Sequence, residues 1–360
     1  EQLFQELGRS KQGLIIVGRS IRNVCNNSIL QLAETLNLPV LPDVQSHLRF
    51  EEHSNIINHF DLTLLSEVTQ EQRPDFVLHF GGAFTSKRLL KYLNDSETFY
   101  VSVKETPERI DPNHQVNIEI LSKIDDFCDR LNSHKMDGDG LWLKTWQMNE
   151  AHISKSVSNL LGNESMLSEP GVSYQLSNVI PHDHDLMLAN SMSIREMEMF
   201  ASIGQLKGDI FANRGSSGID GLLATAAGYS SGSQRPVTIL MGDLAFLHDL
   251  NSLQLISTSK QPIIMVIINN NGGGIFSFLP VRNETDVFEP FFGTPHGLTL
   301  GNAASMFGLA YSKPTDLDEF ITTYSMAAQE GTSILIEIST DRNQNHDFHQ
   351  QIFKSLRESI

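Results

Sequence analysis

Cysteine is nearly absent from this sequence. Its 360 residues include only Cys25 and Cys128, and neither belongs to a paired motif. Two isolated thiols do not support a disulfide framework, and they fit a reducing compartment in which both side chains act as small hydrophobes. We therefore expect a cytoplasmic protein.

Positive charge is scarce as well, and long apolar runs are missing. The chain carries 26 lysines and arginines against 43 acidic residues, which gives a formal net charge of −17 at pH 7. This excess of acid argues against nucleic acid or an anionic membrane as a partner. No apolar run approaches the ~18 residues of a membrane-spanning helix, and no signal-peptide pattern opens the sequence. We therefore expect no nucleic-acid partner and no membrane partner.

The dinucleotide fingerprint G-x-G-x-x-G is also absent, so Gly18-Arg19-Ser20 is interpreted as a strand-to-helix turn. What the sequence has instead is an alternation of apolar strands and helices. Strands are predicted at residues 13–18, 75–82 and 97–104, and helices at 23–36, 86–92 and 117–131, the last with Cys128 on its apolar face. This alternation predicts a doubly wound α/β domain over residues 1–145.

A second α/β domain is predicted over residues 146–360. The periodicity lapses into a linker between Asn132 and Asn149, and a helix is expected from about Glu150. Ser193 is a suitable N-cap for a later helix, with Glu196 at the capping-box position. The predicted fold class is therefore α/β, with two doubly wound, mostly parallel sheets that have helices on both faces.

The stretch from residue 237 to residue 276 has the most informative pattern. An apolar strand, VTILM, ends in Gly242-Asp243, a helical segment follows, and a second apolar strand, IIMVII, ends in Asn269-Asn270-Asn271 and three glycines. A strand, a helix and a strand within about 30 residues form a βαβ unit with parallel strands. Asp243 and Asn270 should therefore meet at the carboxyl edge of the sheet, where open α/β sheets bind ligands.

A carboxylate and an amide oxygen at adjacent strand ends suit a hard divalent cation such as Mg²⁺. The glycines after Asn270 let a backbone carbonyl reach the same ion, and Gly242 with the next helix start offers backbone N–H groups to phosphates. On geometry alone, an ordinary Rossmann-like unit with a polar strand end is an equally good interpretation, because a lone Gly-Asp or Asn-Asn pair is common. Asp249, further along the helix, is interpreted as a solvated position.

Gly242-Asp243, followed after 26 residues by Asn270, resembles the thiamine-diphosphate (ThDP) motif. The segments GDL, DLNSLQL and NNNGGGIFSFLP, with NRGSSGIDGLLATAAG upstream, resemble one ThDP family in particular. That family is the 2-succinyl-5-enolpyruvyl-6-hydroxy-3-cyclohexene-1-carboxylate (SEPHCHC) synthases of menaquinone biosynthesis. The resemblance implies that residues 1–145 are a middle domain and residues 146–360 a diphosphate-binding domain, with ThDP and Mg²⁺ or Mn²⁺ as cofactors.

The resemblance also implies which residues bind the cofactor. The metal ligands would be Asp243, Asn270 and the Gly272 carbonyl. In that family a large aliphatic side chain supports the folded cofactor, and Ile219 matches its position, although Ile219 taken alone would be a core residue at a helix start. The implied ThDP site comprises Ile219, Gly242, Asp243, Leu244, Ala245, Asn270, Gly272 and Ile275.

The implied reaction is the decarboxylation of 2-oxoglutarate and the addition of the resulting succinyl semialdehyde carbanion to isochorismate, giving SEPHCHC and CO₂. Both substrates are dicarboxylates, so an acidic chain must gather cations locally, best as arginines. Taken singly, each of the candidate cations would be an ordinary surface residue. The matching residues are Ser191, Arg195 and Arg214 for the oxoglutarate carboxylate, Lys87 and Arg88 for isochorismate, and Ile275 and Phe276 for the apolar wall beside the thiazolium.

Enzymes of this type carry a further, N-terminal domain that binds the pyrimidine ring and supplies an activating glutamate. The resemblance implies that this domain is absent from the 360 residues, and that the active site lies at a subunit interface of a homodimer or homotetramer. Two alternatives stay open. One is another ThDP-dependent 2-oxo acid decarboxylase or carboligase, of the acetolactate-synthase type, and the other is a non-catalytic cofactor-binding fragment.

Overall fold

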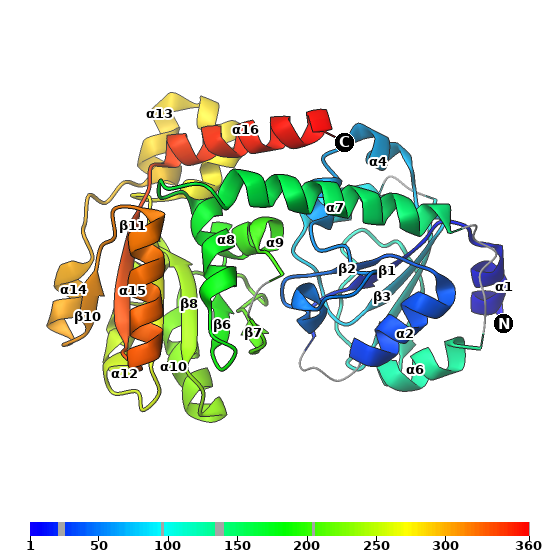
Figure 1. Cartoon of the computed structure of the whole chain (residues 1–360), viewed down its shortest axis with the longest axis horizontal. Coiled ribbons are helices and arrows are strands. Elements are labelled where there is room, and N and C mark those ends of the chain that lie inside the picture. The colour runs from blue at the N-terminus through cyan, green and yellow to red at the C-terminus, as the bar shows by residue number, and fades with distance from the viewer. Residues whose placement is uncertain (21–25, 95–96, 134–139, 204–205, 360) are drawn as a thin grey trace. The chain divides into compact units, whose positions relative to one another are not determined.

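The computed structural model describes residues 1–20, 26–94, 97–133, 140–203 and 206–359, so Cys25 lies outside the described residues. The chain divides into two compact units (Figure 1). The first unit comprises residues 1–157 together with 353–360, and the second comprises residues 158–352. The predicted domain boundary at residues 145/146 falls within the long helix α7 (Leu141–Leu161).

The first unit is built on a five-stranded sheet in which all paired strands are parallel. Its strands β1 and β3 are buried along their whole length, as expected where helices cover both faces of a parallel sheet. In spatial order the strands are β2 (Val40–Pro42), β1 (Gly13–Val17), β3 (Phe76–Phe80), β4 (Phe99–Lys104) and β5 (Val116–Leu121).

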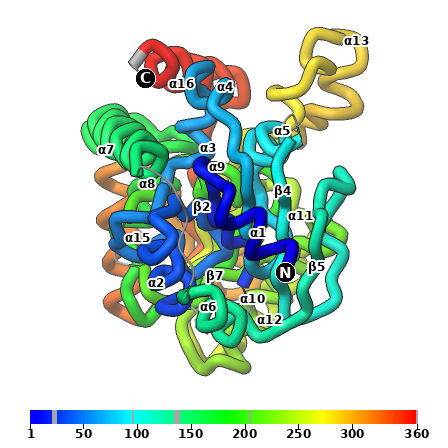
Figure 2. The backbone as a smooth tube through the Cα atoms, turned by 90° about the vertical axis from the view of Figure 1, so that its right-hand side faces the viewer, coloured from blue at the N-terminus to red at the C-terminus, as the bar shows by residue number. Residues whose placement is uncertain are grey.

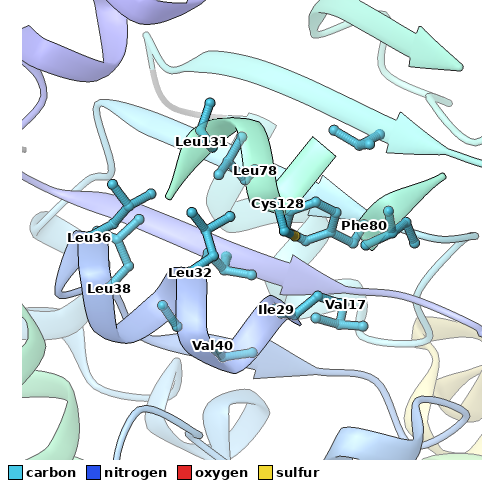
Figure 3. Packing of buried hydrophobic residues seen from close by; sticks show 14 of the residues in the cluster. Val17, Ile29, Leu32, Leu36, Leu38, Val40, Leu78, Phe80, Cys128 and Leu131 are labelled. Carbon is cyan, nitrogen blue, oxygen red and sulfur yellow. The ribbon is translucent and has the colours of Figure 1, made fainter. Parts of the chain in front are cut away.

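Two apolar cores cover the two faces of this sheet, because successive side chains of a strand point to opposite faces. Ile15 and Val17 of β1 pack with α2 and α6, and Figure 3 shows Val17 in this core. Leu14 and Ile16 pack with Trp142 of α7 and with α3 and α5. The helices of this unit are α1 (Gln2–Arg9), α2 (Asn26–Leu36), η1 (His47–Phe50), α3 (Phe60–Thr63), α4 (Glu67–Glu71), α5 (Lys87–Asn94), α6 (Ile124–Leu131) and most of α7.

Two sequence predictions for this unit were wrong. Residues 117–121 belong to strand β5, and the helix that contains the buried Cys128 begins only at Ile124. The segment VNIEIL alternates half-buried and exposed positions, which is the period of an edge strand rather than of a helix, and β5 lies beside β4 at the edge of the sheet (Figure 2). Helix α7 begins at Leu141, inside the predicted linker, because Trp142 is buried and its Nε1 donates to the Gly13 carbonyl at 2.8 Å.

The second unit contains a six-stranded sheet whose paired strands are again all parallel, which confirms the predicted fold class. The βαβ unit predicted around Asp243 lies at its centre, where β8 pairs with β9 and Gly242 is opposite Ile268. In spatial order the strands are β10 (Ala310–Ser312), β11 (Ile334–Ser339), β9 (Ile263–Asn269), β8 (Val237–Gly242), β6 (Asp185–Leu188) and β7 (Ile210–Phe211).

Helices cover both faces of the second sheet. Helices α10 (Leu222–Ser233) and α12 (Leu253–Ser257) pack on the face that holds Ile239 and Met265, whereas α15 (Leu317–Glu330) lies on the opposite face, where the Tyr324 and Thr238 hydroxyl oxygens are 2.7 Å apart. The remaining helices are α8 (Glu169–Val179), α9 (Met192–Phe200), α11 (Asp243–His248), η2 (Leu250–Ser252), η3 (Gly274–Phe278), η4 (Pro280–Asn283), α13 (Thr285–Phe288), the π-helix η5 (Glu289–Gly293), α14 (Gly301–Met306) and α16 (Arg342–Ser359). Within the described ranges, no helix is both long and apolar enough to cross a membrane.

Two predictions on buried acids in this unit were also wrong. Helix α9 begins at Met192 after Ser191, and its N-cap side chain makes no capping bond. Glu196 is buried instead, and its carboxylate lies 3.0 Å from Nε2 of the buried His349. Asp249 is not solvated either, because it is only 9% exposed and its Oδ2 accepts the Ala224 N–H at 3.0 Å. His349 and Ala224 are distant from these acids in sequence, although Oδ1 of Asp249 also accepts the nearby Ser252 hydroxyl at 2.6 Å.

Candidate active site

A cavity of about 330 Å³ lies at the carboxyl edge of the second sheet, beyond strands β6, β8 and β9. This is the edge at which open α/β sheets bind ligands. The cavity brings together every site residue that was predicted within the second unit. These residues are Ser191, Arg195, Arg214, Ile219, Gly242, Asp243, Leu244, Ala245, Asn270, Gly272, Ile275 and Phe276.

Asp243 is the first residue of α11 and is only 1% exposed. Its Oδ2 accepts the Gly272 N–H at 2.9 Å and lies 3.0 Å from Nε2 of His296, while its Oδ1 accepts the Leu244 N–H at 2.6 Å. A carboxylate offers about four acceptor positions, and these contacts occupy three of them. One position on Oδ1 is therefore left for a cation, and Leu244 contributes by orienting the carboxylate.

Asn270 follows β9 and is 8% exposed. Its Nδ2 donates to Oε1 of Glu169 at 2.8 Å, whereas its buried Oδ1 has no hydrogen-bond partner among the residues that the structure describes. A buried amide oxygen without a partner costs free energy unless a ligand satisfies it. This unsatisfied oxygen, the free position on Asp243 and the adjacent Gly272 carbonyl form a set of oxygen donors that fits Mg²⁺ or Mn²⁺.

Gly272 has a backbone conformation that only glycine adopts readily. Its φ is +134°, and a Cβ atom at this position would lie 1.9 Å from the Gly293 carbonyl oxygen. The close approach is part of the site, because the Gly273 N–H donates to the same carbonyl at 2.8 Å and so ties the glycine loop to η5. The run of three glycines is therefore required by backbone packing beside the proposed cation site.

We expect Gly272→Ala to lower the free energy of unfolding by about 3 kcal/mol or more, because the methyl group adds overpacking to an unfavourable φ. Gly308→Ala is the matched control. Its φ is +68°, but nothing described lies within 4 Å of the added Cβ, so we expect a loss of about 1 kcal/mol. Urea denaturation of both variants measures the difference, and equal losses would show that the contact with Gly293 relaxes freely.

Two guanidinium groups face the same cavity. Arg195 lies on α9 and donates from Nη1 to the Ser191 carbonyl, and Arg214 donates from Nη1 to Oδ1 of Asn190 at 3.0 Å. Burial, followed by repulsion from Arg214, lowers the pKa of Arg195. An anion bound between the two groups would relieve this repulsion. The arrangement is therefore suited to a carboxylate ligand.

The predicted apolar residues of the cavity come from η3 and from the segment before α10. Ile275 and Phe276 lie on η3, and the Phe276 ring packs edge-on against Phe292 with the ring centroids 5.3 Å apart. Ile219 precedes α10 and is half-buried against the core of the unit. Ile219 therefore both packs against the core before α10 and lines the cavity, so the two interpretations of this residue are compatible.

Lys87 and Arg88 belong to the first unit, at the start of α5. Lys87 is exposed, while Arg88 forms an ion pair with Asp61 and lies over the Phe353 ring, with its guanidinium carbon 4.7 Å from the ring centroid. They do not line the cavity of the second unit. Their assignment to isochorismate stays a prediction.

Three polar residues at or beside the cavity were not predicted as site residues. Glu169 and Glu196 line the cavity, and His296 contacts Asp243. Burial, together with the charge of Glu196, raises the pKa of Glu169 to about 7. Burial lowers the pKa of His349, but attraction to Glu196 outweighs it, so that the pKa is raised overall. These residues come from separate helices and loops, and no motif spacing connects them.

The fold and the cavity define an α/β protein of the thiamine pyrophosphate enzyme class, and the chain belongs to this family. The family model described as the middle domain of thiamine pyrophosphate matches residues 3–188, and that of the C-terminal TPP binding domain of thiamine pyrophosphate enzymes matches residues 202–338. These matches confirm the predicted class of thiamine-diphosphate enzymes and, with it, thiamine diphosphate as the cofactor of that class.

The individual relatives carry a narrower name than the family models do. The chain is 38% identical to the 2-succinyl-5-enolpyruvyl-6-hydroxy-3-cyclohexene-1-carboxylate synthase of Rubrobacter xylanophilus over 98% of this chain and 62% of that protein. It is 36% identical to the Salinibacter ruber synthase of the same name over 100% of this chain and 61% of that protein. The chain therefore spans about three fifths of the length of these relatives.

A solved structure supports the fold. It is described as a putative thiamin diphosphate-dependent enzyme isolated from Mycobacterium smegmatis, and it matches with a TM-score of 0.66 at 16% identity, over 94% of this chain and 63% of that chain. At this low identity the likeness concerns the fold alone.

Proposed function

We propose that these 360 residues are the middle and diphosphate-binding parts of a ThDP- and Mg²⁺-dependent SEPHCHC synthase, which decarboxylates 2-oxoglutarate and joins the product to isochorismate. The observation that carries the proposal is the content of one cavity. It contains the oxygen donors Asp243 and Asn270 and the guanidinium groups of Arg195 and Arg214. The relatives named as SEPHCHC synthases support the same function.

The chain's own residues have separate roles in this proposal. Bound ThDP would supply the carbon centre to which a 2-oxo acid adds and from which CO₂ is lost. Asp243, Asn270 and the Gly272 carbonyl hold the cation that anchors the diphosphate. Ile219 would support the bound cofactor, while Ile275 and Phe276 would keep water and its protons away from the reacting carbon.

The distal carboxylate of 2-oxoglutarate needs a second set of contacts, because the carboxylate next to the ketone leaves as CO₂. Arg195 and Arg214, with the Ser191 hydroxyl, form this clamp. A pyruvate-specific enzyme of the acetolactate-synthase type has no distal carboxylate to bind, so the paired guanidiniums favour the dicarboxylate substrate. Lys87 and Arg88 are proposed to bind isochorismate, and their positive charges suit its two carboxylates.

Further parts of the proposal concern the whole protein. The activating glutamate would come from a pyrimidine-binding domain outside these residues, and the active site would be shared between subunits of a homodimer or homotetramer. The chain's share of the relatives' length, 62% of the Rubrobacter xylanophilus synthase, supports this division. We also propose a cytoplasmic location, in keeping with the isolated thiols.

We expect the whole protein to form SEPHCHC from 2-oxoglutarate and isochorismate, with one CO₂ released per product, as followed by mass spectrometry and by a coupled CO₂ assay. The 360-residue chain alone should release no CO₂ above background, because the activating glutamate is proposed to lie outside it. Faster turnover of pyruvate than of 2-oxoglutarate by the whole protein would favour the acetolactate-type alternative. CO₂ release by the 360-residue chain at the rate of the whole protein would contradict the division of the site.

A further inference from the structure

Glu169 is a buried acid at an unusual place. It is the first residue of α8, where side chains commonly reach water, yet it is only 3% exposed and lines the cavity. The helix does not need it as a cap, because the preceding Ser168 already accepts the Gly171 N–H at 3.0 Å. Burying a carboxyl group without a compensating contact is costly, so its partners indicate what it does.

The two hydrogen bonds that described residues donate to the Glu169 side chain converge on one oxygen. Its Oε1 accepts Nδ2 of Asn270 at 2.8 Å and the Thr340 hydroxyl at 3.3 Å. Thr340 follows β11, and its backbone N–H donates to the Asn269 carbonyl at 3.1 Å. Glu169 is therefore held against the end of β9 from two directions, directly beside the proposed cation ligand.

The contact with Asn270 has a consequence for the cation. The two ends of an asparagine amide have nearly the same shape, so its neighbours decide which end points where. Oε1 of Glu169 is the acceptor in both of its contacts, and it therefore selects the orientation in which the NH₂ group of Asn270 faces Glu169. The amide oxygen then points away from Glu169, and it is the oxygen left without a partner among the described residues. The flipped amide would present two N–H donors in its place.

We infer that Glu169 is the positioning residue that makes Asn270 present its oxygen, rather than its nitrogen, to the divalent cation. This inference rests on the proposed role of Asn270 as a metal ligand. Metal ligands depend on such outer contacts for their orientation, and loss of one typically weakens metal binding about 10–100-fold. Glu169 acts through Asn270 and needs no contact of its own with the cation.

Glu196 provides a matched control. It lines the same cavity and is equally buried, at 2% exposed, but its carboxylate pairs with His349 instead of Asn270. Replacing either glutamate with methionine removes a buried acid of the same size. If burial of acid near the cavity were all that mattered, the two variants would change metal affinity alike.

The test is a titration of Mg²⁺ into the whole protein with saturating ThDP, measured by calorimetry. A parallel titration with Mn²⁺ is measured by electron paramagnetic resonance. We expect Glu169→Met to raise the Kd for both ions about 10–100-fold. Glu169→Gln, which keeps an acceptor oxygen, should raise it less than about threefold, and Glu196→Met should leave it within about twofold even if it lowers the melting temperature. Unchanged affinity in Glu169→Met would overturn the inference.

Exchanging the acidic and amide side chains of Glu169 and Asn270 controls for a variant that binds Mg²⁺ weakly only because it is partly unfolded. Asn270→Asp alone sets two carboxyl groups against each other, and we expect it to weaken Mg²⁺ binding. Adding Glu169→Gln restores a donor between the two positions, so the double variant should bind at least about tenfold more tightly than Asn270→Asp. Failure of this rescue, with both variants folded, would also overturn the inference. If Asn270→Ala itself leaves the Kd unchanged, the proposed metal site is wrong and the inference falls with it.

Discussion

Replacing Asp243 with alanine is expected to abolish Mg²⁺-dependent ThDP binding by the whole protein. Asp243 is the only anionic member of the proposed donor set. Its carboxylate also accepts hydrogen bonds from the backbone N–H groups of Gly272 and Leu244, and it lies 3.0 Å from Nε2 of His296. The substitution therefore removes a charged ligand and at the same time releases the glycine loop that carries the third donor. We expect the Kd for ThDP in the presence of Mg²⁺ to rise at least about hundredfold, equivalent to ~2.7 kcal/mol.

Asp249→Ala is the control for this experiment. Asp249 is also a buried carboxylate that accepts a backbone N–H, from Ala224, but it does not line the cavity. It should lower the melting temperature without changing the Kd for ThDP more than about twofold. Calorimetry at fixed Mg²⁺, with a parallel titration in EDTA, separates the metal-dependent part of binding. Unchanged affinity in Asp243→Ala would remove the assignment of the metal ligands.

The second large effect is expected at Arg195. A guanidinium can hold the distal carboxylate of 2-oxoglutarate with two parallel charge-assisted bonds, each typically worth ~1.5–3 kcal/mol. Arg195→Lys keeps the charge but loses the planar fork. We expect kcat/KM for 2-oxoglutarate in the whole protein to fall about tenfold or more, which corresponds to ~1.4 kcal/mol upward.

The choice of substrate makes this prediction specific. A monocarboxylic 2-oxo acid has no distal carboxylate, so its kcat/KM should fall much less in Arg195→Lys. The Kd for ThDP should not change, because the proposed cation ligands follow other strands. Equal losses for both substrates would mean that Arg195 supports the fold or the cofactor. The clamp would then have to be sought at Arg214.

Much of the fold and part of the site could be predicted from local sequence. Near-continuous apolar runs such as VTILM and IIMVII are typical of parallel strands buried on both faces, and the predicted helical connection between them consists of α11, η2 and α12. Parallel strands end at the same edge, so the order of residues alone placed Asp243 beside Asn270. For the same reason Arg195, which follows β6, could be expected near them.

Other features depended on contacts between residues far apart in the chain. Edge strand β5 is an exception, because the alternation in its VNIEIL segment already indicates a strand, and the prediction failed by joining this segment to the helix after it. Glu169 is 101 residues from Asn270, and Glu196 is 153 residues from His349. The sequence determined which oxygen and nitrogen atoms reach the edge of the sheet. Only the tertiary structure decided which of them face the cavity, because the orientation of a buried polar group is set by the partners that packing brings to it.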